Sequence, residues 1–140
     1  MSLSAPIWKS SLGPFFVRVP LGLYLFIAGY RKFSAPDDFL EAVRSFHLLP
    51  DHLAVLYGVV LPYAEMLSGF LLFFGFMTTL AAAIGSLVLL SVVVAFGLTP
   101  QDSPVFNKDI IILAACMSLL ATGAGAISVD DFRHSGAKPS

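Results

Sequence analysis

Two charged residues stand inside long apolar stretches of the sequence, where their type and position could support chemistry. Arg18 lies near the start of the stretch Leu12–Tyr30, and Glu65 lies near the centre of the stretch Leu53–Phe76. Ionisable side chains in lipid-embedded segments are energetically costly, so they usually face a bundle interior or a wet cavity. There, a carboxylate and a guanidinium can hold a polar head group, bind a quinone carbonyl or exchange a proton. We therefore take Glu65 and Arg18 as the candidate catalytic residues.

A structural role explains the same two residues. An ion pair between Arg18 and Glu65 would orient two helices without any chemistry, and Arg18 alone could extend to the lipid head groups. At 100° per residue, each of the two shares its helix face with small residues, so the two faces are expected to meet. The residues that share a face with Arg18 are Gly22, Gly29 and Lys32, and those that share a face with Glu65 are Gly58 and Gly69.

The elements that position these residues must be membrane-spanning helices. Of the 140 residues, 57% are hydrophobic and 12% are charged, against about 45–50% and about 25% in soluble proteins, and the mean hydropathy is +0.86. Polar residues are too few to coat a soluble globule, so the apolar excess must face lipid. We predict one all-α domain, an integral membrane four-helix bundle. The expected spans are residues 12–30, 53–76, 80–98 and 110–127, followed by a polar tail over residues 129–140.

The connections between the spans carry helix signals of their own. Phe39, Val43 and Phe46 recur at helical spacing after the acidic start of a segment that begins at Pro36. We predict a short helix from about Pro36 to Phe46 that lies in the membrane interface. An ordinary loop helix packed on the end of the bundle explains the pattern equally well.

The second and third spans are joined by very few residues. Gly75 favours a left-handed helix end, and Thr78 favours the N-cap of the next helix. We therefore predict that these two spans form a tight antiparallel hairpin.

Composition also limits the classes of function. A formal net charge of −1 without a cluster of Lys and Arg lacks the electrostatic footprint that nucleic-acid binding requires. The single cysteine, Cys116, cannot form a disulfide or a dithiol pair within one chain. The three histidines lie outside the expected spans, so we expect neither a metal site nor a haem in the bundle. Whether the chain is itself an enzyme stays open.

Ordered motifs along the chain resemble the signatures of the DoxX-like family of four-span membrane proteins. The first motif is Arg18-x3-Gly22-x3-Phe26-x2-Gly29-x2-Lys32-Phe33. The second is Leu61-Pro62-x2-Glu65-x3-Gly69-x5-Gly75-x2-Thr78, and the third combines Lys108-Asp109 with Gly123-x-Gly125-x2-Ser128-x-Asp130. The resemblance runs from about Phe15 to Asp130. It makes the polar motif positions candidates for cofactor binding, namely Arg18, Lys32, Glu65, Lys108 and Asp109. Three of these residues also have a simpler explanation: Lys32 and Lys108 fit interface anchors, and Asp109 fits a helix start.

The resemblance implies a multi-pass protein of the inner (plasma) membrane, with relatives linked to quinone-coupled thiosulfate oxidation or to thiol and oxidative-stress complexes. One hypothesis is a redox-associated subunit in which Glu65 and Arg18 hold a quinone head group without a covalent bond. A partner subunit would then supply the electrons, because this chain shows no redox centre. The alternative is a non-catalytic structural or assembly subunit of a larger membrane complex. A transporter is less favoured, since four short spans leave little room for an alternating path.

Four spans would place both termini on the same side of the membrane. The terminal side carries Lys9, Arg133 and Lys138, whereas the other side carries Arg31, Lys32, Arg44 and Lys108. Three basic residues against four do not decide the orientation by the positive-inside rule. Our expectation is that both termini are cytoplasmic.

Overall fold

Helices form all the regular structure in the described part of the chain. The computed structural model describes residues 10–96 and 108–136, and no strand occurs within these ranges. The long helices are α1 (Gly13–Ser34), α3 (Asp51–Phe74), α4 (Thr78–Phe96) and α5 (Lys108–Thr122). The short elements are the 3-10 turn η1 (Ser10–Leu12), α2 (Pro36–Ser45) and α6 (Val129–Ser135). The all-α prediction is confirmed.

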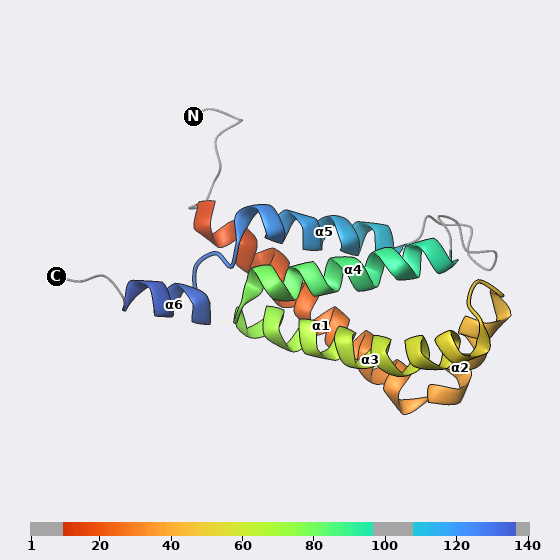
Figure 1. The fold of residues 1–140 in the computed structure, drawn as a ribbon. Helices are drawn as coiled ribbons and strands as arrows, with labels where there is room; N and C mark the ends of the chain where they lie inside the picture. Colours follow the sequence, from red (N-terminus) through yellow and green to blue (C-terminus); the bar gives the residue numbers. More distant parts are fainter. Residues whose placement is uncertain (1–9, 97–107, 137–140) are drawn as a thin grey trace.

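The four long helices lie side by side and successive ones run in opposite directions (Figure 1). Helix α1 packs most extensively against α3, and α4 packs between α3 and α5. Helix α2 lies at one end of the bundle, against α3, and α6 projects at the opposite end (Figure 1). We call these two ends of the bundle the α2 end and the α6 end.

Glycines let α1 and α3 approach until their backbones touch. A Cβ atom added to Gly22 would stand 2.5 Å from a backbone nitrogen of α3, and one added to Gly29 would stand 2.7 Å from the carbonyl oxygen of Pro62. A Cβ atom on Gly69 would meet the backbone nitrogen of Phe26. Close backbone approach gives the van der Waals contact that associates helices in lipid. The prediction that the glycine faces of the first two spans meet is confirmed for Gly22, Gly29 and Gly69, whereas Gly58 faces Leu40 of α2.

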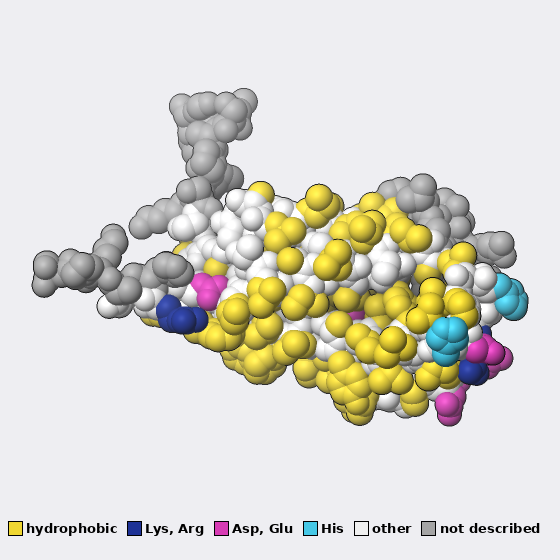
Figure 2. All heavy atoms as spheres, in the orientation of Figure 1, with side chains coloured by type: hydrophobic (Ala, Val, Ile, Leu, Met, Phe, Trp, Pro, Cys, Tyr) yellow, Lys and Arg dark blue, Asp and Glu magenta, His cyan; other side chains and the backbone are white. Residues whose placement is uncertain are grey.

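The face of the bundle seen in Figure 2 is largely apolar along its length, and most of the charge visible on it lies near the ends. Large side chains such as Leu87 and Val94 of α4 are 69% and 71% exposed. Three helices are long and apolar enough to cross a bilayer, namely Gly13–Ser34, Asp51–Phe74 and Thr78–Ala95. The chain is therefore a membrane protein in contact with the lipid bilayer.

Helix α5 is shorter than the span expected from the sequence. It has 15 residues, which is about 22 Å of helix against about 30 Å of hydrocarbon. The helix ends at Thr122 because Gly123 and Gly125 follow with positive φ angles of 74° and 70°. The predicted span over residues 110–127 is thus not helical in its last part. Residues 97 and 98, predicted to end the third span, lie outside the described residues.

The predicted helix between the first two spans is present as α2. It begins at Pro36 and ends at Ser45. Phe39 and Val43 are buried in one cluster with apolar residues of α3 and α4, so the apolar face of α2 covers the end of the bundle. This packing fits the loop-helix interpretation, and contact of α2 with the membrane interface stays a prediction.

A tight turn joins α3 to α4, as predicted. Gly75 ends α3 in the left-handed conformation, with φ 67° and ψ 39°. Thr78 is already the first residue of α4, and its backbone N–H donates to the carboxylate of Asp130 at 2.8 Å. The N–H of Met77 donates to the same carboxylate at 2.9 Å. The prediction that Thr78 caps α4 is therefore wrong, because a carboxylate from beyond α5 caps the helix.

Candidate functional site

An ion pair joins α1 to α3 in the interior of the bundle. The ammonium nitrogen of Lys32 lies 2.5 and 2.7 Å from the two carboxylate oxygens of Glu65. Glu65 is 2% exposed, whereas the side chain of Lys32 is 24% exposed. The acid of the pair is therefore inside the protein, and the base reaches the edge of its surface.

The close crossing of α1 and α3 brings these two groups together. Gly29 lies one turn before Lys32 and allows α1 to lie directly against α3 near Pro62, one turn before Glu65. The ring of Phe39 from α2 lies beside the ammonium group, 5.5 Å from its centroid to the Lys32 nitrogen. Helix α2 thus adds an aromatic contact to the base of the pair.

A second polar contact joins α1 to α5. The hydroxyl of Tyr24 donates to a carboxylate oxygen of Asp109 at 3.3 Å. Asp109 is 16% exposed, and the ammonium group of the exposed Lys108 lies 3.9 Å from the same oxygen. Asp109 also stands in the first turn of α5, where the helix dipole favours an acid, and it interacts electrostatically with Glu65. We call Tyr24, Lys32, Glu65 and Asp109 the interior polar cluster.

Arg18 lies nearer the α6 end, where its partners are backbone carbonyls. It is 1% exposed, and its guanidinium group donates to the carbonyl oxygens of Leu72 at 3.3 Å and Phe73 at 3.1 Å. Both carbonyls belong to the last turn of α3, where the regular hydrogen bonds of a helix run out. The Leu72 carbonyl also accepts from the backbone N–H of Gly75 at 3.1 Å. The guanidinium also donates to the carbonyl of Ile127 at 2.7 Å. Arg18 therefore ties α1 to the end of α3 and to the chain after α5.

The structure does not join Arg18 to Glu65. Both side chains face inward, as predicted, but the partner of Glu65 is Lys32 and the partners of Arg18 are carbonyls. The hypothesis of an ion pair between Arg18 and Glu65 is therefore wrong. Arg18 does not extend to the lipid head groups, and Lys32 is held by Glu65 instead of acting as a simple interface anchor.

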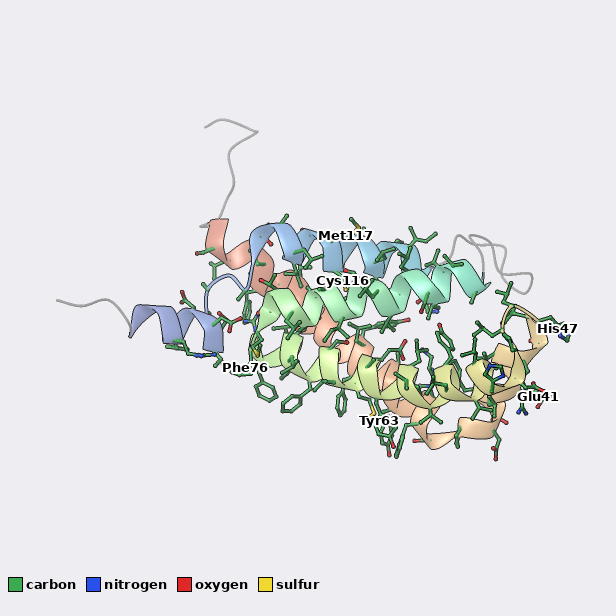
Figure 3. The ribbon with its side chains drawn as sticks, in the orientation of Figure 1. Glu41, His47, Tyr63, Phe76, Cys116 and Met117 are labelled. Atoms are coloured by element: carbon green, nitrogen blue, oxygen red, sulfur yellow. The ribbon has the colours of Figure 1, made fainter. Side chains whose placement is uncertain are left out.

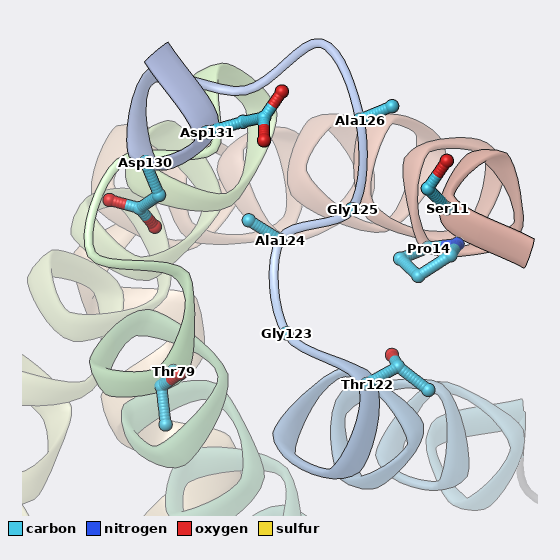
Figure 4. A pocket seen from close by; sticks show the side chains of 10 residues that line it. All are labelled: Ser11, Pro14, Thr79, Thr122, Gly123, Ala124, Gly125, Ala126, Asp130 and Asp131. Atoms are coloured by element: carbon cyan, nitrogen blue, oxygen red, sulfur yellow. The ribbon is translucent and has the colours of Figure 1, made fainter. Parts of the chain in front are cut away.

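A hollow of about 740 Å³ opens at the α6 end between α1, α4 and the chain that leads to α6 (Figure 4). Hydroxyl groups of Ser11 and Thr79 are among its lining, together with Asp130. Burial disfavours the charged form of Asp130, but hydrogen bonds from the backbone N–H groups of Thr78 and Met77 outweigh it and hold the pKa of Asp130 below its ordinary value of 3.8. This carboxylate is a fixed anion that caps α4.

A pair of hydroxyl groups lies between α3 and α4. The oxygens of Tyr57 and Ser91 are 2.8 Å apart, and the Ser91 hydroxyl donates to the carbonyl of Val88 at 2.6 Å. Two grooves of about 240 and 470 Å³ border the pair, and all their other lining residues are apolar. We call these two adjoining grooves the valley between α3 and α4. The Tyr57 and Ser91 hydroxyls are the polar side-chain groups among its lining residues.

Thiol and metal chemistry have little basis in the described residues. Figure 3 shows Cys116 on the inner side of α5 and Met117 on its outer side. Cys116 is completely buried, and a buried thiol in apolar surroundings is unreactive. In the described ranges, no three side chains of His, Cys, Asp or Glu gather as metal ligands. The interior polar cluster is therefore the candidate functional site.

Sequence reasoning missed the partners of several polar residues. Neither Tyr24 nor Tyr57 was predicted to take part in a polar contact, although a tyrosine hydroxyl buried in an apolar helix usually finds a hydrogen-bond partner. Ser128 was noted only as a motif position, yet its hydroxyl accepts a hydrogen bond from the backbone N–H of Asp131 at 3.0 Å and begins α6. The spacing of serine and acid three residues apart is the signal that could have identified this helix start.

Comparison with known proteins assigns the chain to a family. The sequence model of the methylamine utilisation protein MauE family matches residues 10–107, so the chain belongs to the MauE family. The chain is also 24% identical over 127 residues to a protein of Bacillus subtilis (strain 168) described as "Putative oxidoreductase CatD", with 91% of each chain covered. No solved structure matches the chain. The description of the Bacillus subtilis relative gives redox chemistry for that protein.

The family match overturns the resemblance to the DoxX-like proteins, because MauE is a different family of membrane proteins. The first two quoted motifs combine glycines at helical spacing with the basic residues Arg18 and Lys32 and the acidic residue Glu65. Any bundle that crosses two helices closely around an ion pair requires such residues. These two motifs therefore described the contact between α1 and α3 without distinguishing the families.

Proposed function

We propose that this member of the MauE family is a redox-associated subunit of a quinone-linked membrane complex, with Glu65 as its proton-exchanging group. The observation that carries the proposal is the burial of Glu65, 2% exposed and bound through both carboxylate oxygens by Lys32. Buried ionisable residues in membrane helices are typical of proton and ion pathways. The relative described as an oxidoreductase supports a redox setting.

Lys32 gives the buried carboxylate a connection to the edge of the bundle. Its side chain extends from Glu65 to a position that is 24% exposed. Protonation of Glu65 weakens its attraction to the ammonium group, and loss of the proton restores the contact. Because the contact involves no backbone group, the pair can change its charge without disturbing the helices. Glu65 can therefore act as a general acid and base.

Reduction of a quinone to a hydroquinone needs protons as well as electrons, and the role of this chain is to transfer the protons. Both oxygens of Glu65 are held by Lys32, so the geometry favours proton relay over direct binding of a head group. Asp109 and Tyr24 place a second carboxylate and a hydroxyl in the same cluster and extend the relay toward α5. The electrons come from a partner subunit, since the chain has one cysteine and the described residues hold no metal-ligand cluster.

We also place a fourth membrane crossing at α5 and residues 123–127. The segment after α5 bends at Gly123, Gly125 and Ile127, whose φ angles are positive, so it lengthens the crossing by less than the about 3.3 Å per residue of an extended chain. Non-helical backbone is tolerated at membrane depth where protein groups satisfy it. Here Ile127 accepts a hydrogen bond from Arg18, and the N–H of Ala126 donates to the carbonyl of Ser11 at 2.7 Å. Four crossings of the inner (plasma) membrane place both termini on one side, for which we propose the cytoplasm.

The alternative is a non-catalytic structural or assembly subunit. The observation in its favour is the close approach of the α1 and α3 backbones at Gly22 and Gly69. The Lys32–Glu65 ion pair can then serve only to hold α1 against α3. In that case the apolar outer faces of the bundle pack against other subunits, and the ion pair takes no part in proton exchange.

A single variant separates proton exchange from assembly. The full chain is purified from its native membranes in mild detergent, its co-purifying chains and quinones are identified by mass spectrometry, and quinone reduction is measured on the same preparation. In Glu65→Gln, the amide keeps the shape and hydrogen-bonding capacity of the side chain but cannot exchange a proton. We expect the complex to be retained and quinone reduction to fall by about 100-fold.

The matched control is Asp38→Asn, which removes a carboxylate from the exposed face of α2. It should change neither assembly nor quinone reduction. Full quinone reduction by an assembled Glu65→Gln complex would contradict the proposed function. Loss of assembly together with activity would instead support the structural alternative.

A further inference from the structure

The valley between α3 and α4 combines two apolar grooves with the Tyr57–Ser91 hydroxyl pair. The groove of about 240 Å³ lies against α2, where Val43 and Phe46 contribute to its lining. The groove of about 470 Å³ continues between α3 and α4 as far as Ala64. Tyr57 and Ser91 line both grooves, so the hydroxyl pair lies where the two grooves meet.

The hydrogen bonds within the pair determine what Tyr57 can offer a ligand. A hydroxyl has a single proton, and Ser91 uses its proton on the carbonyl of Val88 at 2.6 Å. Tyr57 is therefore the donor in the 2.8 Å bond to Ser91. Its oxygen keeps unused lone pairs but has no second proton to give. A molecule that binds to Tyr57 in this arrangement must supply the donor itself.

The lining and depth of the valley restrict the molecule further. Sites for small molecules are mostly apolar cavities of about 300–1,000 Å³ with few polar groups, which the two grooves and their hydroxyl pair match. Tyr57 lies about 9 Å along α3 from its first residue, at 1.5 Å per residue, so the pair is reached from within the membrane. A phospholipid acyl chain can fill such a groove, but it has no donor for Tyr57.

We infer that the valley between α3 and α4 binds a lipid-soluble hydroquinone, whose phenolic hydroxyl donates to Tyr57. The ring occupies the groove against α2, and the tail follows the groove between α3 and α4. This inference deepens the proposed function and rests on it for the choice of a hydroquinone among lipid-soluble phenols. Glu65 lies on the same helix as Tyr57, about 12 Å further along α3 at 1.5 Å per residue, so the proton-exchanging group and the bound hydroquinone lie at neighbouring levels of the bundle.

Two probes with identical tails test the hydrogen bond. One is a hydroquinone with a decyl tail, and the other is its dimethyl ether, which has the same ring but no donor. Each is titrated by calorimetry into the full chain in phospholipid nanodiscs. The hydroquinone should bind about 5-fold more tightly than the ether, the effect of one hydrogen bond. In Tyr57→Phe, the hydroquinone should lose this advantage while the ether binds as before.

A second variant changes the hydrogen bonding of Tyr57 and keeps the tyrosine itself. In Ser91→Ala, the tyrosine loses its acceptor and can donate its proton to an oxygen of the ether, so the ether should bind more tightly and the preference for hydroquinone over ether should shrink. The control is Tyr63→Phe, because Tyr63 is 56% exposed, packs edge-on against Phe33 and points away from the bundle (Figure 3). It should leave both affinities unchanged.

The position of the tail is tested with a diazirine at the end of the decyl chain. After illumination, mass spectrometry should find cross-links at residues of the longer groove, such as Leu56, Val60 and Leu87. Equal affinity for hydroquinone and ether, or cross-links elsewhere on the bundle, would overturn the inference. Glu65→Gln should still bind the hydroquinone, so failure of proton exchange and failure of this site give different results.

Discussion

The α6 end and the interior polar cluster both bury charge, but they satisfy it with different partners. Arg18 donates to backbone carbonyls of α3 and of the chain after α5. Lys32 and Glu65 instead bind each other through ionisable side chains. A carbonyl does not titrate, and it moves only when the backbone moves. The first arrangement is therefore a fixed tie, whereas the second can change its charge within an intact fold.

The difference shows which buried charge is worth considering as a functional group. Burial alone does not separate the two regions, since Arg18 and Glu65 are 1% and 2% exposed. The type of partner separates them. A charge that donates to carbonyls at a helix end has a structural explanation, because the last turn of a helix leaves carbonyls short of donors.

The largest effect is expected from Arg18→Met, which breaks the fixed tie. The variant removes the guanidinium donor from the carbonyls of Leu72, Phe73 and Ile127, so the free energy of unfolding should fall by about 3–5 kcal/mol. Unfolding is measured in detergent by titration with sodium dodecyl sulfate and followed by circular dichroism. A loss below about 1 kcal/mol would show that Arg18 does not hold α1 to the end of α3 and to the chain after α5.

Gly69→Leu tests the crossing on which both regions depend. A Cβ atom at this position meets backbone atoms of α1, so a larger side chain must push α1 and α3 apart. We expect a loss of about 3 kcal/mol in the free energy of unfolding. Gly123→Ala is the control for loss of a glycine, because nothing lies within 4 Å of a Cβ atom there, although its φ of 74° adds some local strain. Equal stability of the two variants would contradict the packing argument.

Lys32→Met sharpens the comparison by breaking the ion pair from its more exposed side. Glu65 is left buried without a cation, so the free energy of unfolding should fall by about 1–3 kcal/mol, less than for Arg18→Met. Replacing Glu65 with leucine in the same chain should restore part of this loss, because no buried charge then remains. A double variant less stable than Lys32→Met would show that the pair stabilises the fold in another way.

The smallest effect concerns Asp130 and pH. Its folded pKa lies below the unfolded value near 3.8, so its contribution is fully present above that value and is lost as the pH falls through the folded pKa. Asp130→Asn should cost about 0.5–2 kcal/mol at neutral pH, the range for a helix cap. The difference between variant and native chain should shrink below about pH 4. A difference in melting temperature that is constant from pH 7 to pH 3 would contradict the capping role.

The sequence predicted the helices well and the contacts between them less completely. Apolar length and helical spacing suffice for α1, α2, α3 and the hairpin at Gly75, because these features are local. The partner of Glu65 was misassigned because Arg18 and Lys32 share one face of α1. Helical periodicity does not tell which turn of α3 each of them meets. The level at which α1 and α3 cross, at Gly22 and Gly69, decides which residues face each other. That level depends on how the two helices pack, which the sequence of either helix alone does not contain.

The same limitation explains α5. Hydropathy continues through Ala126 and Ile127, so composition extends the span, but the glycines at positions 123 and 125 take positive φ angles and end the helix at Thr122. Residues such as Tyr57 and Ser91 escape detection for another reason. Each is ordinary in its own helix, and the pair exists only because α3 packs on α4.

The cap on α4 has a consequence for the order in which the protein matures on the ribosome. The N–H groups of Met77 and Thr78 receive their acceptor from Asp130, which is 52 residues after Thr78. The hairpin of α3 and α4 is therefore synthesised, and can enter the membrane, while the start of α4 still lacks its acceptor. Translation of the segment after α5 closes this end of the bundle, so a nascent chain released earlier would carry a hairpin that frays at α4.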